Sequence, residues 1–242
     1  MRSAVSWKLN HPYQRLLLAL LALMALATIL FGAMQAYRVH NFRNHNALRA
    51  REQTHLDLAQ GFRHELQVAR VTLHHLDAVH DLSSLSRHER EIDASLIRSR
   101  GLLVLMHQGG EFRPMAGADD MAALGVVPIR PMPPELLAHA SKLAPLVQGI
   151  MDQAGGIIRI LRRGLEGQEA ADEDLQAVHD RIAALFTQAE EVAATLVRDA
   201  RQRIDACVSA QETDFNRILL VNSTLITLVL LSMAALCLRS MR

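Results

Sequence analysis

Cysteine, proline, glycine and aromatic residues are all scarce in this chain of 242 residues. It has 2 Cys, 7 Pro and 12 Gly, and only 4% of its residues are aromatic. Two cysteines exclude a disulfide scaffold, and so little glycine and proline excludes collagen-like and low-complexity chains. Half of the sequence is hydrophobic, mostly Ala and Leu, with 10 Met. Because these residues favour helices, the composition predicts an all-α fold.

Acidic residues are absent from both ends of the chain. Residues 38–217 hold all 25 Asp and Glu and 21 of the 26 Lys and Arg, which gives this region a net charge of −4. The other five basic residues lie in the two ends. A basic domain that binds nucleic acid is therefore not expected, because its charge would gather on a positive patch.

Two long runs carry no charge, at residues 16–37 and 218–238. At about 1.5 Å per residue the first run extends about 33 Å as a helix, which matches the thickness of a bilayer core. A cleaved signal peptide is the alternative for the first run, although its apolar part is usually only about 7–15 residues long. A buried core helix is the alternative for the second run. Both are predicted to be transmembrane helices.

The two tails determine the expected orientation. Residues 1–15 and 239–242 are short, basic and free of acid, and such tails remain in the cytoplasm. The region 38–217 would then lie outside a bacterial inner membrane, in the periplasm of a Gram-negative cell. One basic cluster argues the other way, and it consists of Arg38, Arg43, Arg49 and Arg51.

Apolar residues repeat at helical spacing through the central region. Four helices are predicted, over residues 38–82, 86–108, 134–164 and 171–217. The first has a stripe with spacings of three and four, made by Leu58, Phe62, Leu66, Ala69, Leu73 and Leu76. The third has a longer one, made by Leu136, Ala140, Leu143, Val147, Ile150, Ala154, Ile157, Leu161 and Leu165. The expected fold is a membrane-anchored antiparallel four-helix bundle, with its first and last helices continuous with the transmembrane helices.

Two local features set the ends of the second helix. Ser86 and Glu89 have the spacing of a capping box, which places the helix start at Ser86. Gly109-Gly110 ends it, and residues 109–134 are predicted to form a loop. The alternative is a β-hairpin in which Leu102–Gln108 and Glu111–Met115 flank the two glycines.

The last helix has an apparent change of phase. Its apolar stripe runs through Leu175, Val178, Ile182, Leu185, Ala189, Val192 and Leu196. After Leu196 it moves to Val197, Ala200, Ile204 and Cys207. Such a shift is typical of a stutter in a coiled coil, so this segment is a candidate switching element.

This layout resembles the periplasmic four-helix-bundle input regions of bacterial chemoreceptors and sensor histidine kinases. The local resemblance is to the type IV pilus chemoreceptor and nitrate-sensor kind, through the Leu-rich run 102–108, Gly109-Gly110, Pro131–Pro134 and the helix from Leu136. It implies a signal-sensing input module. The Gly-Arg-Gln-Arg-like stretch of nitrate sensors has only Leu48–Gln53 in its place, so no ligand is carried over. No cytoplasmic output part follows, so the chain is expected to be either an excised input module or a protein that signals through a cytoplasmic partner.

No catalytic motif is found, so the chain is not expected to be an enzyme or to hold a cofactor. Two other functions stay open beside the sensor. One is a membrane-anchored scaffold of an envelope assembly. The other is a periplasmic metal or pH sensor, because the chain has 12 His, a residue that binds metals and titrates near neutral pH.

Charged residues interrupt the first helix's apolar stripe near the membrane. Upstream of Leu58 the stripe passes through Arg51 and His55. A buried Arg without a partner is costly, so Arg51 needs an anion. Arg49, Arg51 and His55 are therefore the candidate ligand-binding residues. The alternative partner of Arg51 is an acid of the last helix, Asp205 or Glu212.

The partners expected beyond this are membrane lipid and a second copy of the chain. Polar residues in the second apolar run, such as Asn222 and Thr227, can hydrogen-bond between helices. Cys207 is too far along one helix from Cys237 to bond with it. It is either a buried thiol or the site of a disulfide to its mate in a homodimer.

Overall fold

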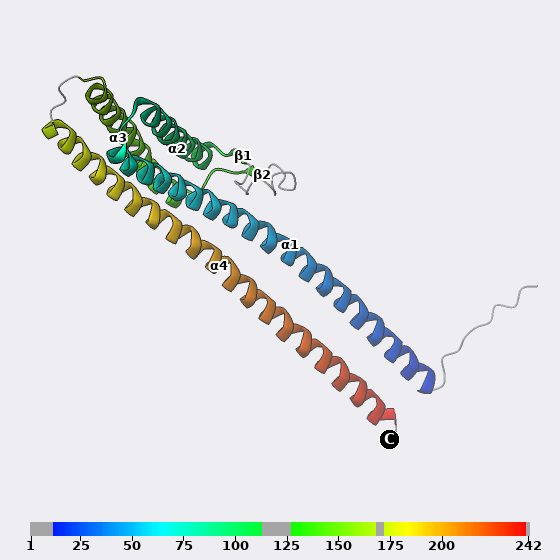
Figure 1. Cartoon of the computed structure of the whole chain (residues 1–242). Helices are drawn as coiled ribbons and strands as arrows, with labels where there is room; N and C mark the ends of the chain where they lie inside the picture. The colour runs from blue at the N-terminus through cyan, green and yellow to red at the C-terminus, as the bar shows by residue number, and fades with distance from the viewer. Residues whose placement is uncertain (1–11, 113–126, 168–171, 241–242) are drawn as a thin grey trace, which may run out of the picture. The chain divides into compact units, whose positions relative to one another are not determined.

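The computed structural model describes residues 12–112, 127–167 and 172–240. Four helices dominate it: α1 (Pro12–His74), α2 (Leu82–Gln108), α3 (Pro134–Leu165) and α4 (Asp172–Ser240). Figure 1 shows the four helices, coloured from blue at the N-terminus to red at the C-terminus. The helices pack against one another, which confirms the predicted all-α fold.

The chain divides into two compact units. The first, called the apolar unit here, joins Met1–Leu48 with Cys207–Arg242, and the second, called the bundle unit, is Arg49–Ala206. Helices α1 and α4 each contribute residues to both units. Each unit is described by itself below.

The core of the bundle unit is built from the predicted stripes. All six predicted residues of the α1 stripe, from Leu58 to Leu76, are buried. In α3 the predicted positions from Leu136 to Ile157 are buried, and Leu161 and Leu165 pack partly buried against them. The apolar periodicity therefore predicted correctly which faces of these two helices form the core.

Helix α4 corrects the predicted change of phase. Its buried residues are Ile182, Phe186, Ala189, Ala193, Leu196 and Ala200. Their spacing alternates between four and three without a break, so the stripe passes Leu196 without a stutter. The prediction followed Leu185 and Val192, which are only partly buried at the flanks of the true stripe. The segment after Leu196 is therefore not a switching element on this ground.

The junction between α1 and α2 also differs from the prediction. Helix α1 ends at His74 and is followed by a 3-10 turn, η1 (His75–Ala78), whereas the prediction continued it to Leu82. Helix α2 begins at Leu82, and its N-cap is Asp81, whose carboxylate accepts a hydrogen bond from the Ser84 N–H at 2.8 Å. The predicted start at Ser86 is wrong because the aspartate satisfies the free N–H groups one turn earlier.

A small antiparallel sheet follows α2, where the favoured prediction was a loop. Strand β1 (Gly110–Phe112) pairs with β2 (Val127–Ile129), and Gly110 faces Ile129. This is not the alternative hairpin, because Leu102–Gln108 stays helical and β1 pairs with a distant segment. Gly109 makes the turn out of α2 with a φ of 71°, a left-handed conformation that favours glycine. Residues 113–126 lie outside the described part.

In its described residues, 12–48 and 207–240, the apolar unit consists of segments of α1 and α4. Both are long and apolar enough to cross a membrane. Their large apolar side chains are exposed, for example Ile29 at 68% and Leu230 at 61%. In water such a surface would be unfavourable, whereas lipid tails solvate it without cost.

Candidate functional site

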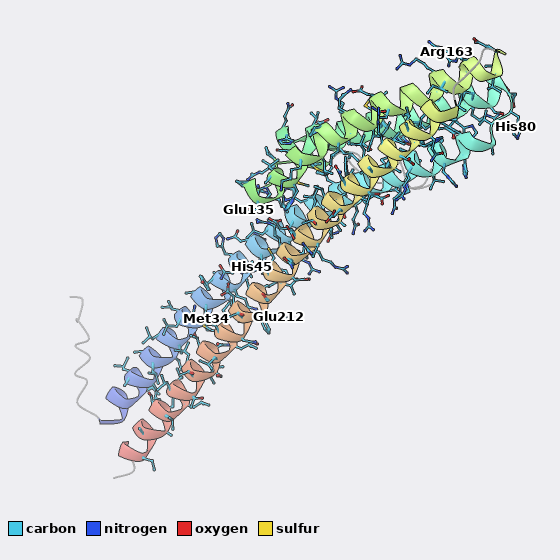
Figure 2. The ribbon with its side chains drawn as sticks, turned by 90° about the vertical axis from the view of Figure 1, so that its left-hand side faces the viewer. Met34, His45, His80, Glu135, Arg163 and Glu212 are labelled. Atoms are coloured by element: carbon cyan, nitrogen blue, oxygen red, sulfur yellow. The ribbon has the colours of Figure 1, made fainter. Side chains whose placement is uncertain are left out.

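A group of charged side chains lies among the helices at one end of the bundle unit. It consists of Glu52 and His55 on α1, Glu135 on α3 and Arg203 on α4, and it is called the polar cluster here. In Figure 2, Glu135 lies at the end of the bundle unit opposite His80 and Arg163. The polar cluster is thus close in sequence to the points where α1 and α4 enter the apolar unit.

Glu52 and Arg203 form its central ion pair. The Nε of Arg203 donates to Oε2 of Glu52 at 3.0 Å, and Nη2 donates to Oε1 at 3.3 Å. Arg203 also reaches Glu135, with Nη1 3.5 Å from Oε2. Such a two-pronged contact fixes orientation as well as charge. One guanidinium therefore joins α1, α3 and α4.

The Glu52 carboxylate is kept ionised although its side chain is only 8% exposed. Burial by itself would raise its pKa, but the hydrogen bonds and positive charge of Arg203, together with His55, lower the pKa below its ordinary value. Glu52 is consequently a buried anion whose charge depends on its partner on α4.

His55 is fully buried beside this carboxylate, as its place in the stripe predicted. Its Nδ1 lies 3.5 Å from Oε2 of Glu52, and its Nε2 lies 3.4 Å from the backbone oxygen of Arg130. Among the described residues Nδ1 has no hydrogen-bond partner of good geometry. A buried ring nitrogen in this state costs free energy, so His55 is not explained by stability alone.

The two arginines predicted to bind a ligand lie differently. Arg51 is half-buried, and its Nε has no hydrogen-bond partner in the described part of the chain. The predicted pair with Asp205 or Glu212 is not found: both acids are exposed, and Arg51 has no ion pair among the described residues. Arg49 is exposed. The structure therefore buries His55 beside Glu52, leaves Arg51 half-buried and Arg49 exposed, and the binding of a ligand by these residues stays a prediction.

Sequence reasoning missed Glu52 and Arg203, which form the central ion pair of the polar cluster. The buried face of α1 passes through Glu52, His55 and Ala59 rather than through Arg51. Glu52 precedes His55 by three residues, which is helical spacing, and that was the available signal. Arg203 lies three residues after Ala200, the last buried member of the α4 stripe.

Other ion pairs join neighbouring helices of the bundle unit. Arg70 of α1 reaches Glu190 of α4 at 2.6 Å, and Arg162 of α3 reaches Glu89 of α2 at the same distance. His139 of α3 lies 3.1 Å from Asp199 of α4. These pairs are partly exposed to solvent, so each contributes little to stability. Glu52 differs from them because it is buried.

The described residues offer no metal site of the ordinary kind. No group of three or more His, Cys, Asp or Glu is arranged to hold a metal ion in 12–112, 127–167 and 172–240. Cys207 is a partly buried free thiol. Whether it bonds to a second copy stays a prediction.

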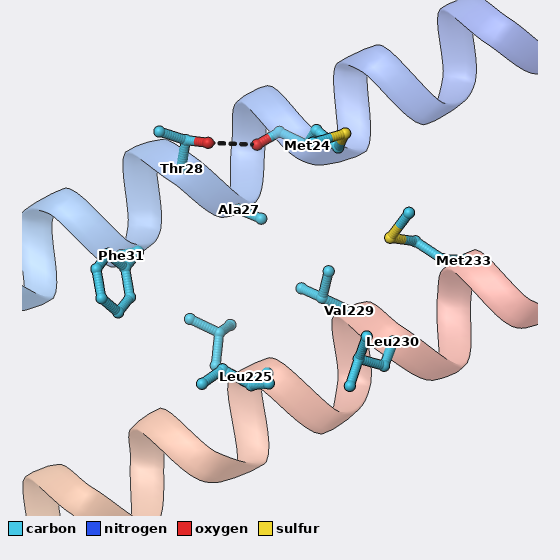
Figure 3. Close-up of a pocket in the computed structure, with 9 residues that line it drawn as sticks. Met24, Ala27, Thr28, Phe31, Leu225, Val229, Leu230 and Met233 are labelled. Atoms are coloured by element: carbon cyan, nitrogen blue, oxygen red, sulfur yellow. Dashed lines mark hydrogen bonds between the residues drawn. The ribbon is translucent and has the colours of Figure 1, made fainter.

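The apolar unit has a crevice between its two helices. It has a volume of about 330 Å³ and is lined from α1 by Met24, Ala27, Thr28 and Phe31, and from α4 by Leu225, Ile226, Val229, Leu230 and Met233. Figure 3 shows that the Thr28 hydroxyl is bonded to the backbone oxygen of Met24, at 2.8 Å. With its one hydroxyl satisfied within the helix, the crevice offers apolar contact and no polar chemistry.

Comparison of the chain with protein-family models, with curated proteins and with solved structures found no match. The resemblance to bacterial sensor bundles therefore stays a prediction.

Proposed function

We propose that this protein is a transmembrane signal-input module. In this proposal the bundle unit lies outside a bacterial inner membrane, detects a ligand or a state of the cell envelope, and changes the position of α4 relative to α1. A cytoplasmic partner reads that change, and a second copy of the chain completes a homodimer.

The observation that carries the proposal is the continuity of two helices. Helix α1 runs unbroken from Pro12 to His74 and α4 from Asp172 to Ser240, so each belongs to both units. A continuous helix is stiff along its axis, so a shift at one end reaches the other end. A soluble bundle with separate membrane anchors would not need such long helices.

The polar cluster supports the proposal with a place where two packings can compete. Signalling by conformational change needs two states close in free energy, and a ligand that binds one better than the other. A core of Leu alone would favour one packing strongly. Instead Glu52, His55 and Arg203 meet there, and buried ion pairs contribute less to stability than apolar contacts of the same volume. The contact between α1 and α4 at this level is therefore easier to rearrange.

The test measures whether the bundle unit controls the far ends of the two helices. The full chain is reconstituted in lipid nanodiscs with Cys207→Ser and Cys237→Ala, and spin labels are placed at Leu18→Cys and Leu238→Cys. Pulsed electron paramagnetic resonance then gives the distance distribution between the labels. Arg203→Gln, which breaks the central ion pair, should shift or broaden this distribution.

The matched control is Arg201→Gln, which removes the same charge from an exposed position two residues away on α4. It should leave the distribution as in the unsubstituted chain. If Arg203→Gln also leaves it unchanged while the bundle unit stays folded, the polar cluster does not communicate with the membrane ends, and the proposed mechanism is wrong.

A further inference from the structure

A second polar site lies between α1 and α2 in the bundle unit, apart from the polar cluster. It is a groove with a volume of about 410 Å³, and it is called the arginine groove here. Its polar lining consists of Thr72 on α1 and of Arg87, Arg90, Glu91, Ser95 and Arg98 on α2. Arg87, Glu91, Ser95 and Arg98 follow one another at spacings of four, four and three, so they share one face of α2, and Arg90 lies at the edge of that face, three residues after Arg87.

The floor of the arginine groove has two hydroxyl groups. Thr72 is 8% exposed and Ser95 is 1% exposed. The Ser95 oxygen accepts a hydrogen bond from Nη2 of Arg98 at 3.1 Å. In the described part of the chain neither hydroxyl proton is donated to an acceptor. A hydroxyl that lines a groove with its proton unused can donate to an anion bound there.

The side chains that line the arginine groove carry more positive than negative charge. Arg98 is neutralised, because its Nη2 lies 2.9 Å from Oε2 of the buried Glu65. Arg87 and Arg90 have no carboxylate within ion-pair distance among the described residues. Arg90 uses its Nε to donate to the backbone oxygen of Ser86 at 3.1 Å, and its two terminal nitrogens have no partner in 12–112, 127–167 and 172–240.

One acid opposes these two arginines. Glu91 lines the same groove and is exposed. Its negative charge lowers the affinity of the groove for an anion, but two unpaired guanidinium groups outweigh one carboxylate.

We propose that the arginine groove binds a small oxyanion, a carboxylate or a phosphate, with Arg87 and Arg90 as its charged contacts and Thr72 and Ser95 as hydroxyl donors. Arginine suits this task because its planar group donates two parallel hydrogen bonds to such oxygens. The volume is large enough for an organic anion of several carbons. As the ligand of a receptor, this anion rests on the function proposed above, whereas its binding can be measured without it.

Calorimetric titration of the full chain in nanodiscs of uncharged phosphatidylcholine tests the proposal. Citrate and inorganic phosphate are the two probes, at constant ionic strength. At least one of them should bind saturably. Arg87→Gln with Arg90→Gln should raise its Kd by about tenfold or more, because two charge-assisted hydrogen bonds are lost. Thr72→Val, which keeps the shape and removes the hydroxyl, should raise it by a smaller factor.

The matched control is Arg63→Gln with Arg100→Gln. These arginines are exposed, belong to the same two helices and do not line the groove. The two control substitutions remove the same charge as the two groove substitutions, and they should change Kd by no more than about twofold, since distant exposed charges are screened by salt. Glu91→Gln should lower Kd, which a purely structural role of this residue would not do.

Three results would overturn the proposal: neither probe binds saturably at millimolar concentration, the groove and control variants weaken binding equally, or Glu91→Gln fails to tighten it. The spin-label distances separate this outcome from that of the proposed function. Binding without any change in the distance between Leu18→Cys and Leu238→Cys upholds the site and contradicts the signalling role. If neither citrate nor phosphate binds but Arg203→Gln still shifts the distance distribution of the spin labels, only the proposed anion site is contradicted.

Discussion

At the scale of single residues, the bundle unit is distinguished by ionisable side chains inside its core. Glu52, His55 and Glu65 are all less than a tenth exposed. Each has a cationic or backbone neighbour that reduces the cost of burial: Arg203 for Glu52, the Arg130 oxygen for His55 and Arg98 for Glu65. Removing one member of such an ion pair leaves an unpaired buried charge, which lowers the stability of the fold more than removing both members does.

The ion pair of Glu52 and Arg203 gives the first prediction. Arg203→Leu should lower the free energy of unfolding by about 2 kcal/mol, because the carboxylate stays buried without its partner while the lost guanidinium was partly in solvent. Glu52→Leu combined with Arg203→Leu should recover most of that loss, because the double variant has no unpaired charge. Denaturant unfolding of the full chain in detergent, analysed as a double-mutant cycle, measures both.

An additive result of this cycle would contradict the prediction. The losses of Glu52→Leu and Arg203→Leu would then simply sum in the double variant. That would mean that the two side chains contribute independently, and that the ion pair does not hold α1 to α4.

The lowered pKa of Glu52 gives a prediction on pH. A carboxyl group whose pKa is lower in the folded state stabilises the fold above its ordinary pKa of 4.5, and this contribution is lost as the pH falls through the lower folded value. Glu52→Gln should therefore be less stable than the unsubstituted chain at pH 7. The difference should narrow as the pH is lowered below about 4.5, as unfolding curves at a series of pH values will show.

Part of the acid sensitivity should remain in Glu52→Gln. The pKa of the Asp81 carboxylate is also well below its ordinary value, because the Ser83 hydroxyl and the Ser84 N–H and hydroxyl donate to it. A stability difference that stays constant from pH 7 to pH 3 would contradict the assignment of this effect to Glu52.

At the scale of elements, the apolar faces of α1 and α3, the end of α2, both ends of α3 and the start of α4 could be read from the sequence to within a residue. The junction between α1 and α2 and the small sheet could not. The stripes of α1 and α3 are long, and burial of many apolar side chains decides them together. The start of α2 depends on one hydrogen bond, that of Asp81 with the Ser84 N–H, and several nearby Ser residues offer the same chemistry. The sheet depends on a partner strand beyond residues 113–126, which no local pattern can indicate.

The same distinction applies to the candidate site. His55 could be predicted because it occupies a position in a strong apolar stripe. Adjacent residues of a helix are separated by a rotation of about 100°, so only one of Arg51 and Glu52 can lie at the centre of the buried face. The sequence pattern predicts Arg51 there, whereas the structure has Glu52. A periodic pattern that starts from Leu58 loses accuracy over two turns, so it cannot decide between adjacent residues. Arg203 was missed because only contact between α1 and α4 in space shows which residue faces Glu52.

The turn at the end of α2 gives a prediction for one glycine. A Cβ at Gly109 would lie 2.6 Å from the backbone oxygen of Ile129, and its φ of 71° is unfavourable for any other residue. Gly109→Ala should lower the free energy of unfolding by about 1–3 kcal/mol and disturb the pairing of β1 with β2. Thermal unfolding followed by circular dichroism measures the loss.

Gly101→Ala is the matched control for this prediction. Gly101 lies within α2, and a Cβ there would meet no atom within 4 Å. The substitution should raise stability by about 0.5–1 kcal/mol, because alanine favours the helix. Equal effects at the two glycines would contradict the role given to the turn.

At the scale of the whole molecule, the two long helices are the central feature. Each combines an apolar segment that is exposed in the apolar unit with a segment that is packed in the bundle unit. If the apolar segments cross a membrane, both ends of the chain lie on one side and the bundle unit lies on the other. The proposed function depends on this arrangement, because a signal can cross only if the sensing and the reading parts are separated by the bilayer.

Labelling of single cysteines in intact cells tests this arrangement most directly. In a chain with Cys207→Ser and Cys237→Ala, the exposed position Arg163→Cys on α3 reports on the bundle unit, and Ser3→Cys and Met241→Cys report on the two tails. A maleimide that cannot cross membranes should label Arg163→Cys in intact cells, and the two tail positions only after the cells are permeabilised. Labelling of a tail in intact cells, or of Arg163→Cys only after permeabilisation, would contradict the account.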